Sequence, residues 1–380
     1  MSASVHRLDL PALDGANPLG FLAALGTLAA LFETDPTVRL GWQAHARWMP
    51  FLQGQQPLNE NSIVATLVEK LAGKPVDKAA EKKRAEAQQG FDAARKSAKD
   101  AQANLKKRKL RGAEREAAWA TEIKPLKQAE RGARDGLLAA LKQAVPSPEL
   151  ALGQRPDCTV AEYREHASSM RTEATPARRT SADLLAAFGV EPYNVGDERI
   201  SPTPFCFITG SGHQWFLDTA RQLMAAVSET KVREALFEPW AYRDEKLTMR
   251  WDPLDDRRYA LLDRDPTASD NKSSTVWMAN LLAYRALALF PCAPIARGLV
   301  TAGWSGDRVQ DCFTWPLWNL PLGVHTVRSL LRHPAFAETN LAAFRPELRA
   351  RGVVAVFQAR RLQVGNPPLH KINFSPAVAR

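Results

Sequence analysis

An apolar helix near the N-terminus, from Leu19 to Phe32, sets the first limit on the fold, because none of its residues is charged. Asn17 precedes it and can cap it, since a side-chain oxygen at that position accepts hydrogen bonds from the free amides of the first turn. Pro18 fits the first helical position, where no amide donor is needed. A helix that is apolar all round is buried. We therefore expect the rest of the chain to pack around it.

Two glycines, Gly20 and Gly26, lie inside this helix. Each costs a helix about 1 kcal/mol relative to alanine. Because a residue without a side chain lets another backbone come close, the two glycines predict tight packing against a neighbouring element.

Length and cysteine usage narrow the class of protein. A chain of 380 residues can bury a large core, and we expect two or more compact parts. It contains no apolar run of about 18 residues, and we expect neither a signal peptide nor a membrane partner. The cysteines are far apart and lack CxxC spacing, which argues against a zinc site and a disulfide framework and suits the cytoplasm. We also expect no cofactor.

The formal net charge of +10 lies almost entirely in one segment. Between Lys74 and Lys142 there are 19 Lys and Arg against 10 Asp and Glu, whereas the remainder has 32 against 31. A basic balance favours polyanions such as nucleic acid or an anionic membrane surface.

The same segment differs in composition from the rest of the chain. From Asp77 to Val145, Ala, Lys, Arg, Glu and Gln dominate and large apolar residues, Trp119 among them, are sparse. These are strong helix formers on a solvated surface. We predict two long antiparallel helices that turn near Gly112, with a kink or break at Pro125. Because heptads are not sustained, a packed hairpin is favoured over a coiled coil.

Outside this arm the pattern predicts an α+β fold without regular βαβ alternation. The expected parts are residues 1–73 as the N-terminal part of a mixed globular core, 74–146 as a basic antiparallel helical hairpin inserted in it, and 147–380 as an α+β core with an Arg-rich C-terminal region. Strands are predicted at Thr203–Thr209 and Leu247–Asp252, and a helix at Val324–Leu331.

The hairpin carries the main candidate site. Eight cations face one acidic residue, Asp100, over a short span: Arg95, Lys96, Lys99, Lys106, Lys107, Arg108, Lys109 and Arg111. This density suits the phosphates of DNA or RNA, whose binding weakens as salt rises. It implies contact with the backbone and not reading of bases. A solvated helical face with no ligand is the alternative.

Further arginines outside the hairpin could also contact nucleic acid. Because the planar guanidinium suits phosphate, four of them are candidate nucleic-acid contacts: Arg178, Arg179, Arg328 and Arg332. Trp304, Trp315 and Trp318 could stack on bases, although core positions are the simpler interpretation.

Other polar patterns favour structure over catalysis. Gly210-Ser211-Gly212-His213 suits a tight turn or an anion contact, and its Ser211 and His213 lack the context of a nucleophile and base. A group of aspartates is interleaved with arginines, so salt bridges are favoured over a metal site: Asp252, Asp255, Asp256, Asp263, Asp265 and Asp270. We therefore predict no catalytic residue, no metal site and no enzyme.

Several stretches resemble the large-subunit family of type I-G (formerly I-U) CRISPR interference complexes, which are of the Cascade type. The stretches are Asp14–Gly26, Trp251–Ala260, the helix ending at Leu289-Phe290-Pro291, Phe313–Trp318 and Val327–Leu330. They are distributed over the chain outside the basic arm, and the arm itself is not matched. They are fold signatures and not catalytic motifs.

The resemblance implies a subunit of a ribonucleoprotein complex in antiviral defence. Its partners would be crRNA, target DNA, the backbone and crRNA-processing subunits, and the helicase-nuclease. Such subunits help to recognise a duplex motif beside the target, hold DNA strands during R-loop formation and recruit the nuclease. Base pairing reads the sequence in RNA-guided systems, while protein reads the backbone and flanking motif.

Two other classes of function stay open. The first is an RNA-free scaffold whose basic hairpin docks on an acidic protein. The second is a hydrolase that uses Ser211 and His213.

Overall fold

The computed structural model describes residues 5–156, 158–175, 179–192, 198–209, 214–255, 274–296, 298–305, 311–338, 340–364 and 371–380. The chain forms two compact units. One, here called the core unit, comprises Met1–Gly73 and Gln154–Arg380, and the other, the arm unit, comprises Lys74–Gly153. The core unit combines helices with small antiparallel sheets, which confirms the α+β class. Within the described residues, no helix is long and apolar enough to cross a membrane.

The first helix, α1 (Pro18–Phe32), is buried along nearly its whole length. The side chain of Asn17 accepts hydrogen bonds from the amides of Leu19, at 2.8 Å, and Gly20, at 3.3 Å. Pro18 occupies the first turn. The cap and the burial predicted from the sequence are both confirmed.

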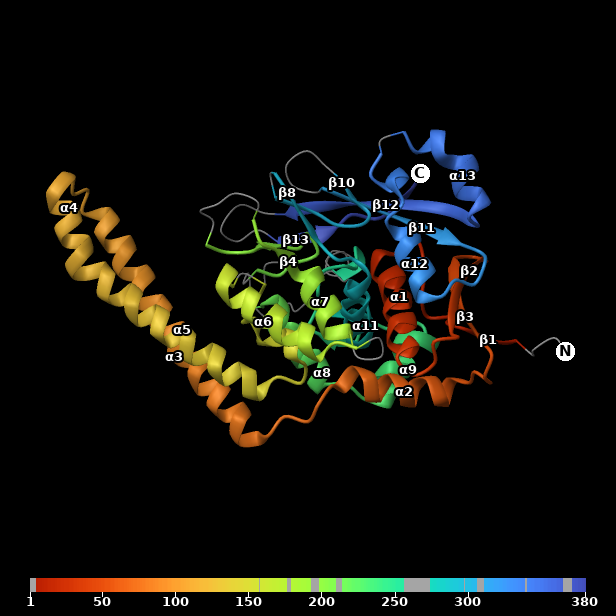
Figure 1. Ribbon diagram of the computed structural model, residues 1–380, viewed down its shortest axis with the longest axis horizontal. Helices are drawn as coiled ribbons and strands as arrows, with labels where there is room; N and C mark the ends of the chain where they lie inside the picture. The colour runs from red at the N-terminus through yellow and green to blue at the C-terminus, as the bar shows by residue number, and fades with distance from the viewer. Residues whose placement is uncertain are drawn as a thin grey trace. The chain divides into compact units, whose positions relative to one another are not determined.

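Helix α1 packs against α11 (Trp277–Ala286), and the two lie side by side in the core unit (Figure 1). A Cβ atom added at Gly26 would lie 1.7 Å from the carbonyl oxygen of Leu282, and one at Gly20 would lie 2.4 Å from that of Asp14. Both glycines therefore permit a close backbone approach, as the sequence predicts.

Two antiparallel sheets pack against α1, where the Phe21 ring contacts Trp42 of one sheet and Trp315 of the other. The first has the strand order β1-β3-β2, from β1 (His6–Asp9), β2 (Arg39–Ala44) and β3 (Trp48–Gly54). The second has the order β10-β11-β12-β13, with β14 also paired to β12, from β10 (Trp304–Ser305), β11 (Cys312–Trp318), β12 (Val353–Val364), β13 (Lys371–Phe374) and β14 (Val378–Ala379). The Trp318 indole links them by donating to the Leu40 carbonyl at 2.7 Å.

Short elements complete the core unit. The remaining strands pair as β4 (Gly189–Val190) with β5 (Ser201–Pro202), β6 (Asp244–Glu245) with β7 (Ser274–Thr275), and β8 (Ala293–Ile295) with β9 (Gly298–Val300). The remaining α-helices are α2 (Glu60–Ala72), α6 (Val160–Glu173), α7 (Thr180–Phe188), α8 (Phe216–Ala225), α9 (Glu229–Phe237), α12 (Val324–Leu331) and α13 (Arg345–Ala350). Single 3-10 turns are η4 (Leu287–Leu289), η5 (Pro334–Phe336) and η6 (Leu341–Phe344). The helix predicted at Val324–Leu331 is confirmed.

Two predicted strands are wrong. Thr203–Thr209 is largely buried, but the amides of Cys206 and Phe207 donate within the segment, with Cys206 donating to the Thr203 carbonyl at 3.1 Å. In Leu247–Asp252, the Met249 amide donates to the side chain of Asn280 at 2.8 Å. Arg250 has a φ of 62°, which no strand accommodates. The apolar pattern of these two segments therefore reflects their packing in the core and not a strand. Their backbone hydrogen bonds go to turns and side chains instead of to a neighbouring strand.

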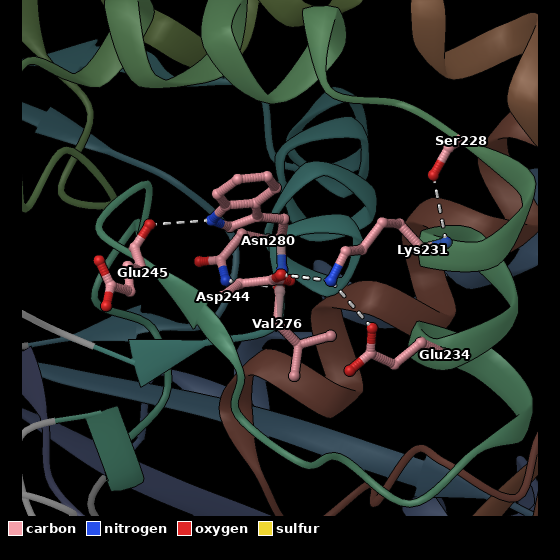
Figure 2. A network of polar contacts seen from close by, with 8 residues as sticks. Ser228, Lys231, Glu234, Asp244, Glu245, Val276 and Asn280 are labelled. Atoms are coloured by element: carbon pink, nitrogen blue, oxygen red, sulfur yellow. Dashed lines mark hydrogen bonds and ion pairs between the residues drawn. The ribbon is translucent and has the colours of Figure 1, made fainter.

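A polar network fixes the start of α11 (Figure 2). Asp244 accepts a hydrogen bond from the Trp277 amide at 2.8 Å and forms an ion pair with Lys231, which also contacts Glu234 at 3.2 Å. Burial opposes the charged form of Lys231, but the hydrogen bonds that its ammonium group donates to Asp244 and Glu234 outweigh this effect and raise its pKa. A carboxylate suits a helix N-terminus, so this network stabilises the helix that packs against α1.

Candidate nucleic-acid interface

The arm unit is a helical hairpin (Figure 1). Its elements are α3 (Lys78–Lys107), α4 (Gly112–Ala118), the π-helical turn η1 (Trp119–Ile123), α5 (Lys124–Ala144) and η2 (Pro148–Leu152). Helix α3 packs along α5, and the chain reverses at residues 108–111, beside Gly112. At the base, the Lys74 amide donates to the Pro146 carbonyl at 2.8 Å. The predicted pair of long helices and their turn are confirmed.

Pro125 marks the predicted break in the returning half of the hairpin. It lies in the first turn of α5, directly after the π-helical turn η1. Proline has no amide to continue a helical ladder, which is why the regular helix cannot run through this position. Just before it, the Lys124 amide donates to the Trp119 carbonyl, five residues back, which is the hydrogen bond of a π-helical turn.

The tip of the hairpin is held by a small apolar cluster and a tight turn. Leu105, Ala118 and Ile123 are buried together there. Lys109 has a φ of 51°, a left-handed conformation that costs a residue with a side chain about 1 kcal/mol. The reversal of the chain thus combines a left-handed residue at Lys109 with a buried apolar contact between the two halves of the hairpin.

Most of the predicted cations of the hairpin face solvent. Arg95 is half-buried, and the exposed ones are Lys96, Lys99, Lys106, Lys107, Arg108, Lys109 and Arg111. Arg108 binds the Glu122 carboxylate at 2.6 and 2.8 Å, so its charge is compensated. Within the arm unit, all of which the structure describes, Lys106, Lys107 and Lys109 form no ion pair. These ammonium groups are therefore available to an external anion.

A hollow of about 570 Å³ lies at the hairpin tip. Its cationic lining comes from Lys99 and Lys106 on α3, Lys109 in the turn and Arg115 on α4, and the Trp119 indole lines it as well. No Asp or Glu is among its lining residues. The arrangement offers several positive charges and one aromatic face to the same ligand.

Arg115 and Trp119 are site residues that the sequence pattern does not single out. By its sequence context, Trp119 is one of the sparse apolar residues of the arm, which suggests a packing role. The available signal is the spacing, because residues four apart lie on one face of a helix. The side chain of Trp119 is 39% exposed.

The structure brings Arg179 and Arg328 of the core unit together on one carboxylate. Arg179 contacts Asp183 at 2.9 and 2.8 Å, and Arg328 contacts it at 2.8 Å. The hydrogen bonds and charge of Asp183 raise the pKa of Arg179. Phosphate binding at either guanidinium would compete with this ion pair. Arg332 is exposed, and Arg178 lies outside the described residues.

A second hollow, of about 300 Å³, adjoins this ion pair in the core unit. It is lined by Glu33 and Asp183 as well as by Arg179 and Arg328. Glu33 already accepts a hydrogen bond from Arg285 at 2.7 Å. Its charges compensate one another, so this hollow does not favour a polyanion.

The three tryptophans considered for base stacking belong to the core. Trp304, Trp315 and Trp318 are at most 2% exposed. The Trp315 indole donates to the Gly15 carbonyl at 2.9 Å and its ring lies 5.7 Å from that of Phe21. The core interpretation is confirmed, and base stacking at these positions is excluded by burial.

The remaining polar candidates are partly buried and partly outside the described residues. Gly210–His213, with Ser211 and His213, lies outside the described residues. Asp252 and Asp255 are buried, and Asp252 accepts hydrogen bonds from Asn17 at 3.0 Å and Tyr242 at 2.8 Å. The other aspartates of that group also lie outside the described ranges: Asp256, Asp263, Asp265 and Asp270. Across the described part of the chain, no group of His, Cys, Asp and Glu is placed to hold a metal ion.

Comparison of the sequence with protein-family models finds no match, and no curated protein matches it either.

Proposed function

We propose that this chain is a non-catalytic, nucleic-acid-binding large subunit of a crRNA-guided type I CRISPR surveillance complex in the cytoplasm. The CRISPR assignment rests on the resemblance of the stretches around α1, α11 and β11. Nucleic-acid binding rests on the arm unit.

The observation that carries the proposal is the uncompensated charge at the hairpin tip. Lys106, Lys107 and Lys109 project from one end of α3 and the turn, without an ion pair in the fully described arm unit. Clustered ammonium groups bind a phosphate backbone by releasing its counterions, and this attraction does not depend on sequence. In this role the hairpin contacts a strand of the target, while pairing with crRNA selects the sequence.

The core unit would then supply the protein contacts of the complex. Its partners in this proposal are the backbone and crRNA-processing subunits and the helicase-nuclease that cuts the target. Arg179 and Arg328 of the core unit are neutralised by their ion pairs with Asp183. This favours protein contacts by the core unit and nucleic-acid contacts by the arm unit, which is the more cationic of the two.

Charge reversal at the tip tests the proposal. In the test variant, Lys106, Lys107, Lys109 and Arg111 become Glu, while Arg108 keeps its ion pair with Glu122. We expect at least roughly tenfold weaker DNA binding at low salt. We also expect log K against log salt to be less steep by about 0.7 to 0.9 for each phosphate that the variant no longer neutralises.

A matched control reverses four exposed basic residues away from the tip, namely Lys74, Lys78, Lys83 and Arg131. It changes the net charge equally, so a purely global charge effect would weaken both variants alike. Equal binding by the tip variant and the unmodified chain would overturn the proposal. Copurification with an acidic protein and no RNA would instead support the scaffold function.

A further inference from the structure

We propose that Trp119 is a base-stacking platform and that the hollow around it holds a segment of single-stranded DNA. This inference rests on the proposed function and adds to it the class of ligand and the residues at its site. It starts from the contrast between Trp119 and its neighbours in the chain.

The local core does not account for the position of Trp119. Ala118 and Ile123, on either side of it in the chain, are buried at the tip with Leu105. The indole between them is 39% exposed and lines the hollow. The exposed part of this indole offers aromatic surface to a ligand in the hollow, and unpaired bases stack on aromatic side chains.

Four cations line the same hollow as the indole, and such cations suit a sugar-phosphate backbone. Lys99 and Lys106 are seven residues apart, or about two helical turns, so they lie on one face of α3. Lys109 and Arg115 line the same hollow from the turn and from α4. Glu122, an acidic residue of the adjacent turn η1, is held by Arg108 at 2.6 Å. The ligand therefore meets several positive charges and an aromatic surface, with no lining carboxylate.

This combination selects single strands over duplexes. In a duplex each base already stacks on its neighbours, so the indole has no free base to contact. A hollow of about 570 Å³ falls within the size range of sites that hold small organic ligands, which accommodates a base with its sugar. Gln102 is the one amide side chain in the lining, so we expect little sequence preference. We assign the strand as DNA because opening of the target duplex, in the proposed function, releases a DNA strand.

The test measures binding of a fluorescent oligo-dT to full-length protein with Trp119→Ala, Trp119→Leu and Trp119→Phe. We expect Trp119→Ala and Trp119→Leu to weaken binding by roughly 5- to 100-fold, and Trp119→Phe to restore most of the affinity. The salt slope should stay unchanged in these variants, because stacking releases no counterions. Lys106→Ala should reduce that slope, and Lys83→Ala, a lysine of α3 outside the hollow, should not.

The outcomes separate this inference from the proposed function. Loss of binding in the tip charge reversal together with full oligo-dT affinity in Trp119→Ala would overturn the stacking platform alone. Equal losses for oligo-dT and a DNA duplex would also overturn it. A loss confined to oligo-rU would overturn the assignment to DNA. Because Trp119 is exposed, the thermal unfolding of each variant should match that of the unmodified chain, and fluorescence of Trp119 should be quenched by oligo-dT.

Discussion

Solvent access separates the tryptophans of this chain by role. Trp315 and Trp318 are fully buried and donate hydrogen bonds to backbone carbonyls, so their indoles serve the core. Trp119 lies in a hollow with cations. A residue type alone does not distinguish the two cases, since tryptophan is common both in cores and in binding sites.

Cys292 gives the chain a pH-dependent stability. Burial raises the pKa of its thiol to about 12 from an ordinary value of 9.0, and its Sγ donates to the Ala187 carbonyl at 3.2 Å. The folded state therefore keeps a proton that the unfolded state releases above pH 9. This contribution to the free energy of unfolding is complete below pH 9 and is lost as the pH rises toward 12.

We expect Cys292→Ser to flatten that dependence, since the hydroxyl does not titrate in this range. Urea unfolding at pH 8 and at about pH 10.5 measures the effect. The unmodified chain should lose roughly 1–2 kcal/mol more than the variant between these pH values. Burial also raises the pKa of Tyr163, so some alkaline loss should persist in the variant. Identical pH profiles for the two proteins would contradict this account.

At the scale of elements, the contact between α1 and α11 depends on Gly26. A methyl group there would overlap the Leu282 carbonyl oxygen, at 1.7 Å, and backbone cannot move aside as a flexible side chain can. We expect Gly26→Ala to lower the free energy of unfolding by at least about 2–3 kcal/mol. Denaturant titration measures it.

The matched control is Gly132→Ala in α5, where an added Cβ would meet nothing within 4 Å. Alanine should stabilise that helix by about 0.5–1 kcal/mol. If both variants gained stability, the close approach of α1 and α11 would be refuted.

Elements with local signals were predictable from the sequence. Asn17 and Pro18 define the start of α1, and composition defines the two helices of the arm. The segments at Thr203–Thr209 and Leu247–Asp252 were not predictable, because their amides bond to turns and to the distant side chain of Asn280.

The candidate site was predictable in its charges but not in its shape. The lysine cluster is visible in the sequence, whereas the hollow depends on how the turn and the π-helical segment place α4 against α3. The ion pair of Arg179 and Arg328 with Asp183 likewise joins residues far apart in the chain. Contacts between residues so far apart in the chain produce no periodic pattern in the sequence from which they could be predicted.

At the scale of the whole molecule, the excess positive charge lies within one of the two compact units. The arm unit, Lys74–Gly153, has 19 Lys and Arg against 11 Asp and Glu, whereas the core unit has 32 against 30. A nearly balanced core suits protein partners, and a cationic arm suits a polyanion. The central claim is that the arm unit contains the nucleic-acid interface.

Deletion of the arm tests this claim most directly. Because the Lys74 amide and the Pro146 carbonyl are 2.8 Å apart, a short Gly-Ser linker can replace residues 75–145. The measurement is the salt dependence of oligo-dT affinity, taken with a thermal unfolding curve. We predict that the variant unfolds cooperatively and has lost most of its affinity, with a slope of log K against log salt close to zero. A folded variant that retains the affinity and slope of the unmodified chain would contradict the account.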